Sequence, residues 1–187
     1  VAFCLAKALL VGKKEELAVL YPDFVKVVAM ATLADMMPLD VAFNRTITYG
    51  GFQQMKKNPL KLIKAFGMVL KIERLKSDDL SFQMIPRMNA VGRLGDANVV
   101  VEALLEEDMD ALLAKITTFN SINEERKKIG EAIFDEIIEK HLDDAKNGFF
   151  LAYSPNWHQG VLGIVAQKVM QKLQRPVILL AQNSDDA

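Results

Sequence analysis

Two arginines and two glycines within residues 86–96 (PRMNAVGRLGD) form the stretch of this chain most suited to holding an anion. Arg87 and Arg93 flank Asn89, and both glycines lie close to Arg93. Arginine presents a planar fork of donors that matches phosphate oxygens, and glycine lets the backbone approach a ligand closely. The pattern predicts a phosphate-binding loop. The alternative is an ordinary turn between two helices with solvated arginines.

A second candidate is the loop at residues 154–160 (SPNWHQG), between a strand-like segment and a helix-like segment. Ligands of open α/β sheets bind beyond the carboxyl ends of parallel strands, where the following helix presents free N–H groups and a partial positive charge. His158 and Gln159 would add donors, and Trp157 would add a stacking surface. The alternative is a capping loop in which the tryptophan is an anchor.

Asp35 is a carboxylate within the otherwise apolar residues 31–39 (ATLADMMPL). Burying a carboxylate is costly unless it is paired, hydrogen-bonded or bound to a metal ion. The residues alone leave three alternatives open, namely a helix-end cap, a salt bridge with an arginine such as Arg45, and a metal ligand.

Hydrophobic periodicity and turn residues predict the elements that position these side chains. The longest periodic stretch is residues 108–142, a helix whose apolar stripe also contains Arg126. Strands at residues 149–153 and 176–181 with a helix at 160–173 between them predict a βαβ unit with parallel strands and a right-handed crossover, and hence a mostly helical α/β protein. Further helices are expected at residues 1–10, 24–37 (after Pro22), 44–57, 60–69, 77–84 and 97–105.

The composition describes a globular chain with one domain or two small ones. Of its 187 residues 51% are hydrophobic, and its net charge of −1 means that any nucleic-acid contact must come from local patches. The single cysteine, Cys4, excludes an internal disulfide and a cysteine zinc site, and it predicts a reducing, cytoplasmic location with Cys4 buried. No apolar stretch has the length needed to cross a bilayer. Because the chain begins without methionine, we expect an excised fragment of a longer protein.

Three runs in this order resemble the RecJ-type single-stranded-DNA-specific exonucleases of the DHH phosphoesterase family. They are TLADMMPLD at residues 32–40 followed by Asn44-Arg45, PRMNAVGRLG at 86–95, and WHQGVLGIVA at 157–166. The resemblance covers essentially the whole chain. It implies a metal-dependent phosphodiester hydrolase that degrades single-stranded DNA from 5′ to 3′ in repair and recombination.

The resemblance also implies roles for individual residues. Asp35 would be a catalytic residue and a metal ligand, the last aspartate of a cluster that binds Mn²⁺ or Mg²⁺. Residues 1–107 would be the C-terminal part of the DHH domain, 108–148 a connector helix and linker, and 149–187 the truncated start of a DHHA1 substrate-binding domain. The implied partners are single-stranded DNA, a helicase and a single-strand-binding protein, with no membrane contact. The implied substrate-binding residues are Arg93, Arg87, Asn89, His158 and Gly160.

The chain departs from the family pattern because it contains no Asp-His-His motif and no upstream cluster of aspartates. Half a metal site cannot assemble the reaction centre, so we expect the isolated chain to be inactive as a nuclease. Two alternatives stay open. One is a DHH phosphodiesterase of short oligonucleotides or cyclic dinucleotides, and the other is a non-enzymatic helical domain that binds nucleic acid.

Overall fold

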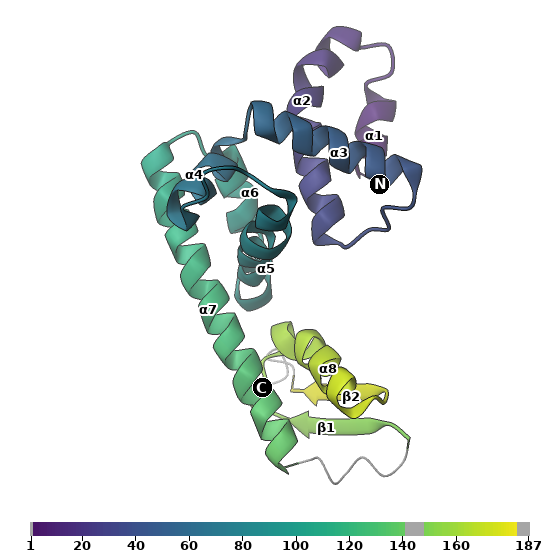
Figure 1. The fold of residues 1–187 in the computed structure, drawn as a ribbon, viewed down its shortest axis with the longest axis vertical. Helices are drawn as coiled ribbons and strands as arrows, with labels where there is room; N and C mark the ends of the chain where they lie inside the picture. The colour runs from purple at the N-terminus through teal and green to yellow at the C-terminus, as the bar shows by residue number, and fades with distance from the viewer. Residues whose placement is uncertain (1, 141–147, 183–187) are drawn as a thin grey trace. The chain divides into compact units, whose positions relative to one another are not determined.

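The computed structural model describes residues 2–140 and 148–182, which form two compact units (Figure 1). Unit 1 comprises residues 1–89 and 98–118, and unit 2 comprises residues 90–97 and 119–187. Two helices contribute to both units, α5 (Ile85–Leu94) and α7 (Met109–Lys140). No helix of the described ranges combines the length and the apolar character needed to cross a bilayer.

The regular elements in the described residues of unit 1 are all helices, in agreement with most of the predicted helices. It contains a π-helix, η1, directly before α5, where a helix was predicted at residues 77–84. α1 buries no side chain, and Cys4 is exposed, so the prediction that Cys4 is buried is wrong. The other elements are α1 (Ala2–Leu9), α2 (Lys14–Ala34), α3 (Ala42–Lys57), α4 (Lys61–Leu70), η1 (Asp79–Met84), α6 (Asn98–Leu105) and the first part of α7.

α2 starts ten residues earlier than the predicted helix at 24–37, and Pro22 lies inside it. Two glutamates in its first turn, Glu15 and Glu16, favour a helix start at Lys14 because they interact well with the positive end of the helix dipole. Proline removes the hydrogen bond to the carbonyl four residues back, here that of Ala18. Ala18 and Pro22 are exposed, so water can satisfy that carbonyl.

Gly51 lies where α3 packs against α2. A Cβ at this position would lie 2.3 Å from the carbonyl oxygen of Val25 and 2.5 Å from the Cβ of Ala29. Neither atom belongs to the far end of a flexible side chain, so only glycine fits without separating the two helices.

Replacing Gly51 by alanine is therefore expected to lower the free energy of unfolding by about 2–3 kcal/mol, as overpacking does elsewhere. Gly50→Ala is the matched control, because its Cβ would meet no atom within 4 Å. Its better helix propensity should stabilise the chain by up to about 1 kcal/mol. Urea unfolding of the two variants measures the difference, and equal midpoints would contradict the close packing of α2 and α3.

Residues 85–94 form a continuous helix, so the prediction of a phosphate-binding loop at 86–96 is wrong over most of its length. Three buried residues at intervals of three, Ile85, Met88 and Val91, follow a helical period and outweigh the glycines. The N–H of Ile85 bonds to the carbonyl of Leu80, five residues back, so the π-helical turn ends directly before Pro86.

Unit 2 confirms the predicted βαβ arrangement. β1 (Phe150–Ser154) and β2 (Val177–Ala181) pair in parallel, with Phe150 opposite Val177 and Ser154 opposite Ala181, and α8 (Gln159–Leu173) connects them. The predicted strands began at residues 149 and 176, one residue before the observed strands. Parallel neighbours require such a crossover.

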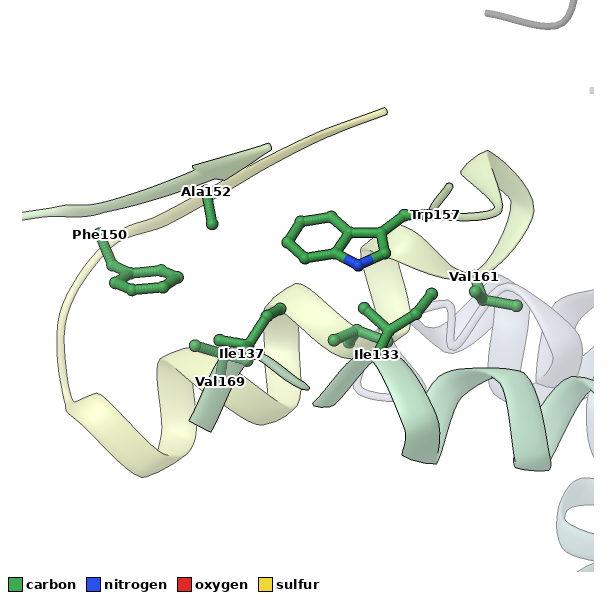
Figure 2. Close-up of a cluster of buried hydrophobic side chains, with 8 residues drawn as sticks. Ile133, Ile137, Phe150, Ala152, Trp157, Val161 and Val169 are labelled. Carbon is green, nitrogen blue, oxygen red and sulfur yellow. The ribbon is translucent and has the colours of Figure 1, made fainter. Parts of the chain in front are cut away.

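The core of unit 2 lies between the sheet, α8 and the C-terminal half of α7 (Figure 2). The isoleucines of the predicted α7 stripe, Ile133 and Ile137, are buried there with Phe150 and Trp157. The stripe prediction is therefore confirmed in this unit. The part of the predicted connector helix and linker that follows residue 140 lies outside the described residues, except for Gly148. The remaining buried members of the core are Ala152, Val161, Val165 and Val169.

Candidate phosphate-binding pocket and candidate metal-ligating carboxylate

The C-terminal end of α5 meets the N-terminal end of α8 within unit 2. Arg93 Nη1 donates a hydrogen bond of 3.2 Å to the carbonyl oxygen of Gly160. A Cβ at Gly160 would lie 1.9 Å from the carbonyl oxygen of Arg93, so glycine is required at this position. Leu94, the next residue, packs against the unit 2 core. These contacts fix the guanidinium of Arg93 beside the first turn of α8.

His158 is the N-cap of α8. Its Nδ1 accepts a hydrogen bond of 3.1 Å from the backbone N–H of Gly160. A neutral ring that accepts at Nδ1 carries its proton on Nε2, which leaves His158 with one side-chain donor for a ligand. The N-terminus of α8 thus combines backbone donors, the positive end of a 15-residue helix and an imidazole N–H.

Trp157 is not the stacking surface expected from the sequence. Its ring is buried in the unit 2 core, and its Nε1 donates a hydrogen bond of 2.9 Å to Glu136 Oε2 on α7. A tryptophan with one polar atom buries its apolar body when that atom finds a partner. Trp157 therefore anchors the loop 154–160 to α7, which was the alternative considered for it.

Arg93, His158 and the first turn of α8 line an open, shallow pocket of about 640 Å³. Arg93 contributes a charged guanidinium group, and His158 and the first turn of α8 contribute N–H donors. Gly163 adds open space, because a Cβ there would meet no atom within 4 Å. Donors converging on an open, glycine-rich surface suit a phosphate group. The lining consists of Gly92, Arg93, Leu94, Gly95, His158, Gln159, Gly160 and Gly163.

Three of the residues expected to bind substrate, Arg93, His158 and Gly160, thus lie together, whereas Arg87 and Asn89 belong to unit 1. Arg87 is half-buried, and its Nη1 donates a hydrogen bond of 2.6 Å to the carbonyl of Gln83 in η1. Asn89 is exposed. On an α-helix, residues six apart point in directions that differ by about 120°, so Arg87 and Arg93 do not form one fork.

Asp35 is exposed, so the expectation of a buried carboxylate is wrong. It is the C-cap of α2, and the next residue, Met36, has a left-handed conformation with φ of 49°. The N–H groups of Met36 and Met37 bond back to Leu33 and Thr32, at 3.1 and 3.0 Å. This pairing is a Schellman turn, in which the left-handed position is usually glycine. The turn directs the chain away from the helix and leaves Asp35 at its end.

A carboxylate at the C-terminal end of a helix is unfavourable, because that end carries a partial negative charge that prefers a cation. Among the described residues Asp35 has no ion-pair partner, and Arg45, the suggested one, donates instead to the carbonyl of Leu39 at 3.3 Å. A bound cation would offset both the charge of the Asp35 carboxylate and the partial negative charge at the end of α2. Residues 2–140 and 148–182 contain no group of three or more His, Cys, Asp or Glu residues that could hold a metal ion. These residues therefore do not fit a metal centre by themselves.

Sequence reasoning missed Arg126, which it placed in the apolar stripe of α7 without a role. The side chain is half-buried, and its Nε is fully enclosed without a hydrogen-bond partner. The signal was present in the sequence, since a charged residue within an apolar helical stripe requires an explanation.

The cap formed by His158 leads to a test of local stability. His158→Ala is expected to lower the free energy of unfolding by about 1 kcal/mol, because the N–H of Gly160 loses its acceptor. His158→Asn should restore most of that loss, because the asparagine side-chain oxygen is a good N-cap acceptor. Thermal unfolding of the chain measures both, and an unchanged midpoint for His158→Ala would show that the cap does not stabilise α8.

No family model matches the chain. In sequence it is 34% identical over 174 residues to the single-stranded-DNA-specific exonuclease RecJ of Haemophilus influenzae, with 88% of this chain and 30% of that protein covered. For RecJ of Escherichia coli the identity is 33% over 172 residues, with 87% and 30% covered. For RecJ of Bacillus subtilis it is 34% over 188 residues, with 96% and 22% covered. The chain spans less than a third of the length of these curated relatives.

In structure the chain is similar to RecJ of Thermus thermophilus in complex with Mg²⁺, with a TM-score of 0.76 and 26% identity over 86% of this chain and 26% of that one. It is also similar to an exonuclease RecJ bound to manganese, with a TM-score of 0.74 and 26% identity over 86% of this chain and 41% of that one. By sequence and by fold, the chain therefore matches one part of the RecJ single-stranded-DNA-specific exonucleases.

Proposed function

We propose that this chain is the part of a metal-dependent single-stranded-DNA exonuclease that binds the phosphate backbone of the DNA. The observation that carries the proposal is the pocket where Arg93 meets the capped N-terminus of α8. Its donors suit a phosphate without reading a base, as expected for an enzyme that acts on a strand of any sequence. We propose that it acts on single-stranded DNA from 5′ to 3′ in repair and recombination, in the cytoplasm.

The assignment of residues to domains is part of the proposal. We assign residues 1–107 to the DHH catalytic domain, 108–148 to a connector helix and linker, and 149–187 to the DHHA1 substrate-binding domain. Asp35 would supply one carboxylate ligand to a site for Mn²⁺ or Mg²⁺, the ions bound in the related RecJ structures. Arg87 and Asn89 remain candidate substrate contacts, and a helicase and a single-strand-binding protein are candidate partners.

One exposed carboxylate does not hold a catalytic metal ion, so we assign no metal chemistry to the described residues alone. We expect the isolated chain to show no nuclease activity, even with Mn²⁺ present. Turnover that scaled with the concentration of the isolated chain and disappeared in Asp35→Ala would contradict this expectation.

A substrate panel on the complete protein tests the proposed function. We expect the complete protein with Mn²⁺ or Mg²⁺ to release mononucleotides from long 5′-phosphorylated single-stranded DNA, and to leave the same sequence intact as a blunt duplex. Faster hydrolysis of dinucleotides or cyclic dinucleotides would instead favour a small-substrate phosphodiesterase. Salt-dependent DNA binding without cleavage under any divalent ion would favour a non-enzymatic binding domain.

A further inference from the structure

Arg126 is a charged residue of unit 2 with a buried side-chain nitrogen that lacks a hydrogen bond. It lies on α7, it is half-buried, and its Nε is enclosed without a hydrogen bond. One turn earlier on the same helix, Asn123 is only 1% exposed, and its Oδ1 also has no partner. An enclosed donor without an acceptor costs about 1–3 kcal/mol, and more when the group is charged. An anion bound at the part of the guanidinium that lines the cavity would offset some of that cost for Arg126.

The surroundings of Arg126 connect it to the Arg93 pocket through α8. Arg126 lines a small cavity of about 90 Å³ together with Val161 and Ile164 of α8. These two residues alternate with Gly160 and Gly163, which line the Arg93 pocket. In the first turns of α8, the glycines thus line the pocket of Arg93, and the apolar side chains line the cavity of Arg126.

The charges in this part of unit 2 favour an anion. Burial lowers the pKa of Arg126, the nearby charge of Arg93 lowers it further, and Glu124 raises it. Glu124 is already paired with Lys127 at 2.8 Å. In the described residues, the two pockets are lined by four cationic side chains and by one carboxylate, that of Glu131; the cations are Arg93, Arg126, Lys127 and Lys168. This local excess of positive charge occurs in a chain with a net charge of −1.

We propose that Arg126 is a second phosphate-binding residue, which contacts the phosphate next to the one held at Arg93 on a single strand of nucleic acid. The strand would cross the first turns of α8, where Gly163 leaves open space. Arginine suits this role because its guanidinium stays charged when half-buried and binds phosphate through two parallel hydrogen bonds. This inference rests on the proposed function and adds a residue to it.

The test measures binding of the complete protein to a 5′-phosphorylated oligothymidylate, without divalent ions, over a series of salt concentrations. Arg126→Gln is expected to weaken binding about tenfold at low salt. It should also reduce the slope of log K against log salt by about 0.7, the value for one phosphate of a single strand. The double variant with Arg93→Gln should lose about twice that slope if the two arginines hold different phosphates.

Lys128→Gln is the matched control, because it removes an exposed cation of α7 that lines neither pocket. It should leave the salt slope unchanged. Arg126→Lys keeps the charge and loses the planar guanidinium, so it should bind DNA several-fold more weakly than the wild type and retain the slope of log K against log salt. This variant replaces Arg126→Gln if Arg126→Gln does not fold. The thermal midpoint of Arg126→Gln should equal or exceed that of the wild type, whereas a structural role would lower it.

The outcomes separate this inference from the proposed function. Wild-type binding that Arg93→Gln weakens and that neither Arg126 variant changes would overturn the role of Arg126 and leave the proposed function standing. A double variant with the slope of Arg93→Gln alone would overturn the second phosphate. A wild-type protein that does not bind the oligonucleotide would overturn both.

Discussion

Gly160→Ala is expected to cause the largest loss of stability in unit 2 and to disable the candidate phosphate-binding pocket. The new Cβ would lie 1.9 Å from the carbonyl oxygen and 2.9 Å from the carbonyl carbon of Arg93. Both are backbone atoms at the end of α5, so no side-chain rotation relieves the clash and one helix must move. We expect a loss of about 3 kcal/mol, at the upper end for overpacking.

Gly163→Ala is the matched control for this prediction. It lies in the same helix, and its Cβ would meet no atom within 4 Å. Better helix propensity should therefore stabilise this variant by up to about 1 kcal/mol. Urea unfolding measures the change in the free energy of unfolding for both variants, with the m-value unchanged between them. Equal unfolding midpoints for the two variants would contradict the close approach of α5 and α8.

Arg93→Gln is expected to weaken binding of single-stranded DNA to the complete protein by about 10- to 100-fold, the range for hydrogen bonds to a charged group. One N–H of Arg93 is engaged by the carbonyl of Gly160, which orients the guanidinium while its exposed remainder faces the pocket. Arg93→Lys should recover only part of the affinity, because an ammonium group restores the charge without the fork.

The control for Arg93 is Arg74→Gln, which removes an exposed arginine that does not line this pocket. It should leave the affinity within about twofold of the wild type, as surface charges away from a site contribute little. Fluorescence anisotropy without divalent ions separates binding from cleavage. Equal affinities for Arg93→Gln and Arg74→Gln would show that Arg93 does not contact phosphate.

Local periodicity was sufficient to predict the elements whose apolar residues repeat regularly. The stripe of α7 and the strand–helix–strand pattern of unit 2 could be read directly, because the same side chains that set the period also form the core. Single residues with strong local preferences caused the errors. The helix start expected after Pro22 is wrong because solvent access lets a helix tolerate this proline. The loop expected at the glycines near Arg93 is wrong because buried apolar neighbours favour a helix there.

The candidate site was predictable in part. Arg93, His158 and Gly160 were identified, but the reason that they lie together is the close contact of α5 with α8, which connects residues far apart in the chain. The exposure of Asp35 and the burial of Trp157 depend on tertiary packing, which periodicity does not report. Arg126 was missed because the apolar stripe around it explained its position without explaining its charge.

The most direct test of the account compares the wild-type complete protein with Asp35→Asn for mononucleotide release from 5′-phosphorylated single-stranded DNA in Mn²⁺. Asparagine keeps the shape of the side chain and removes the charge that a divalent ion requires. We predict that the wild type is active and that Asp35→Asn loses more than about a hundredfold of the activity. This loss would exceed the effect of residues that only support a metal ligand. The DNA affinity of Asp35→Asn without divalent ions should be retained. Equal activity of the two proteins would remove Asp35 from the metal site and contradict the proposed function.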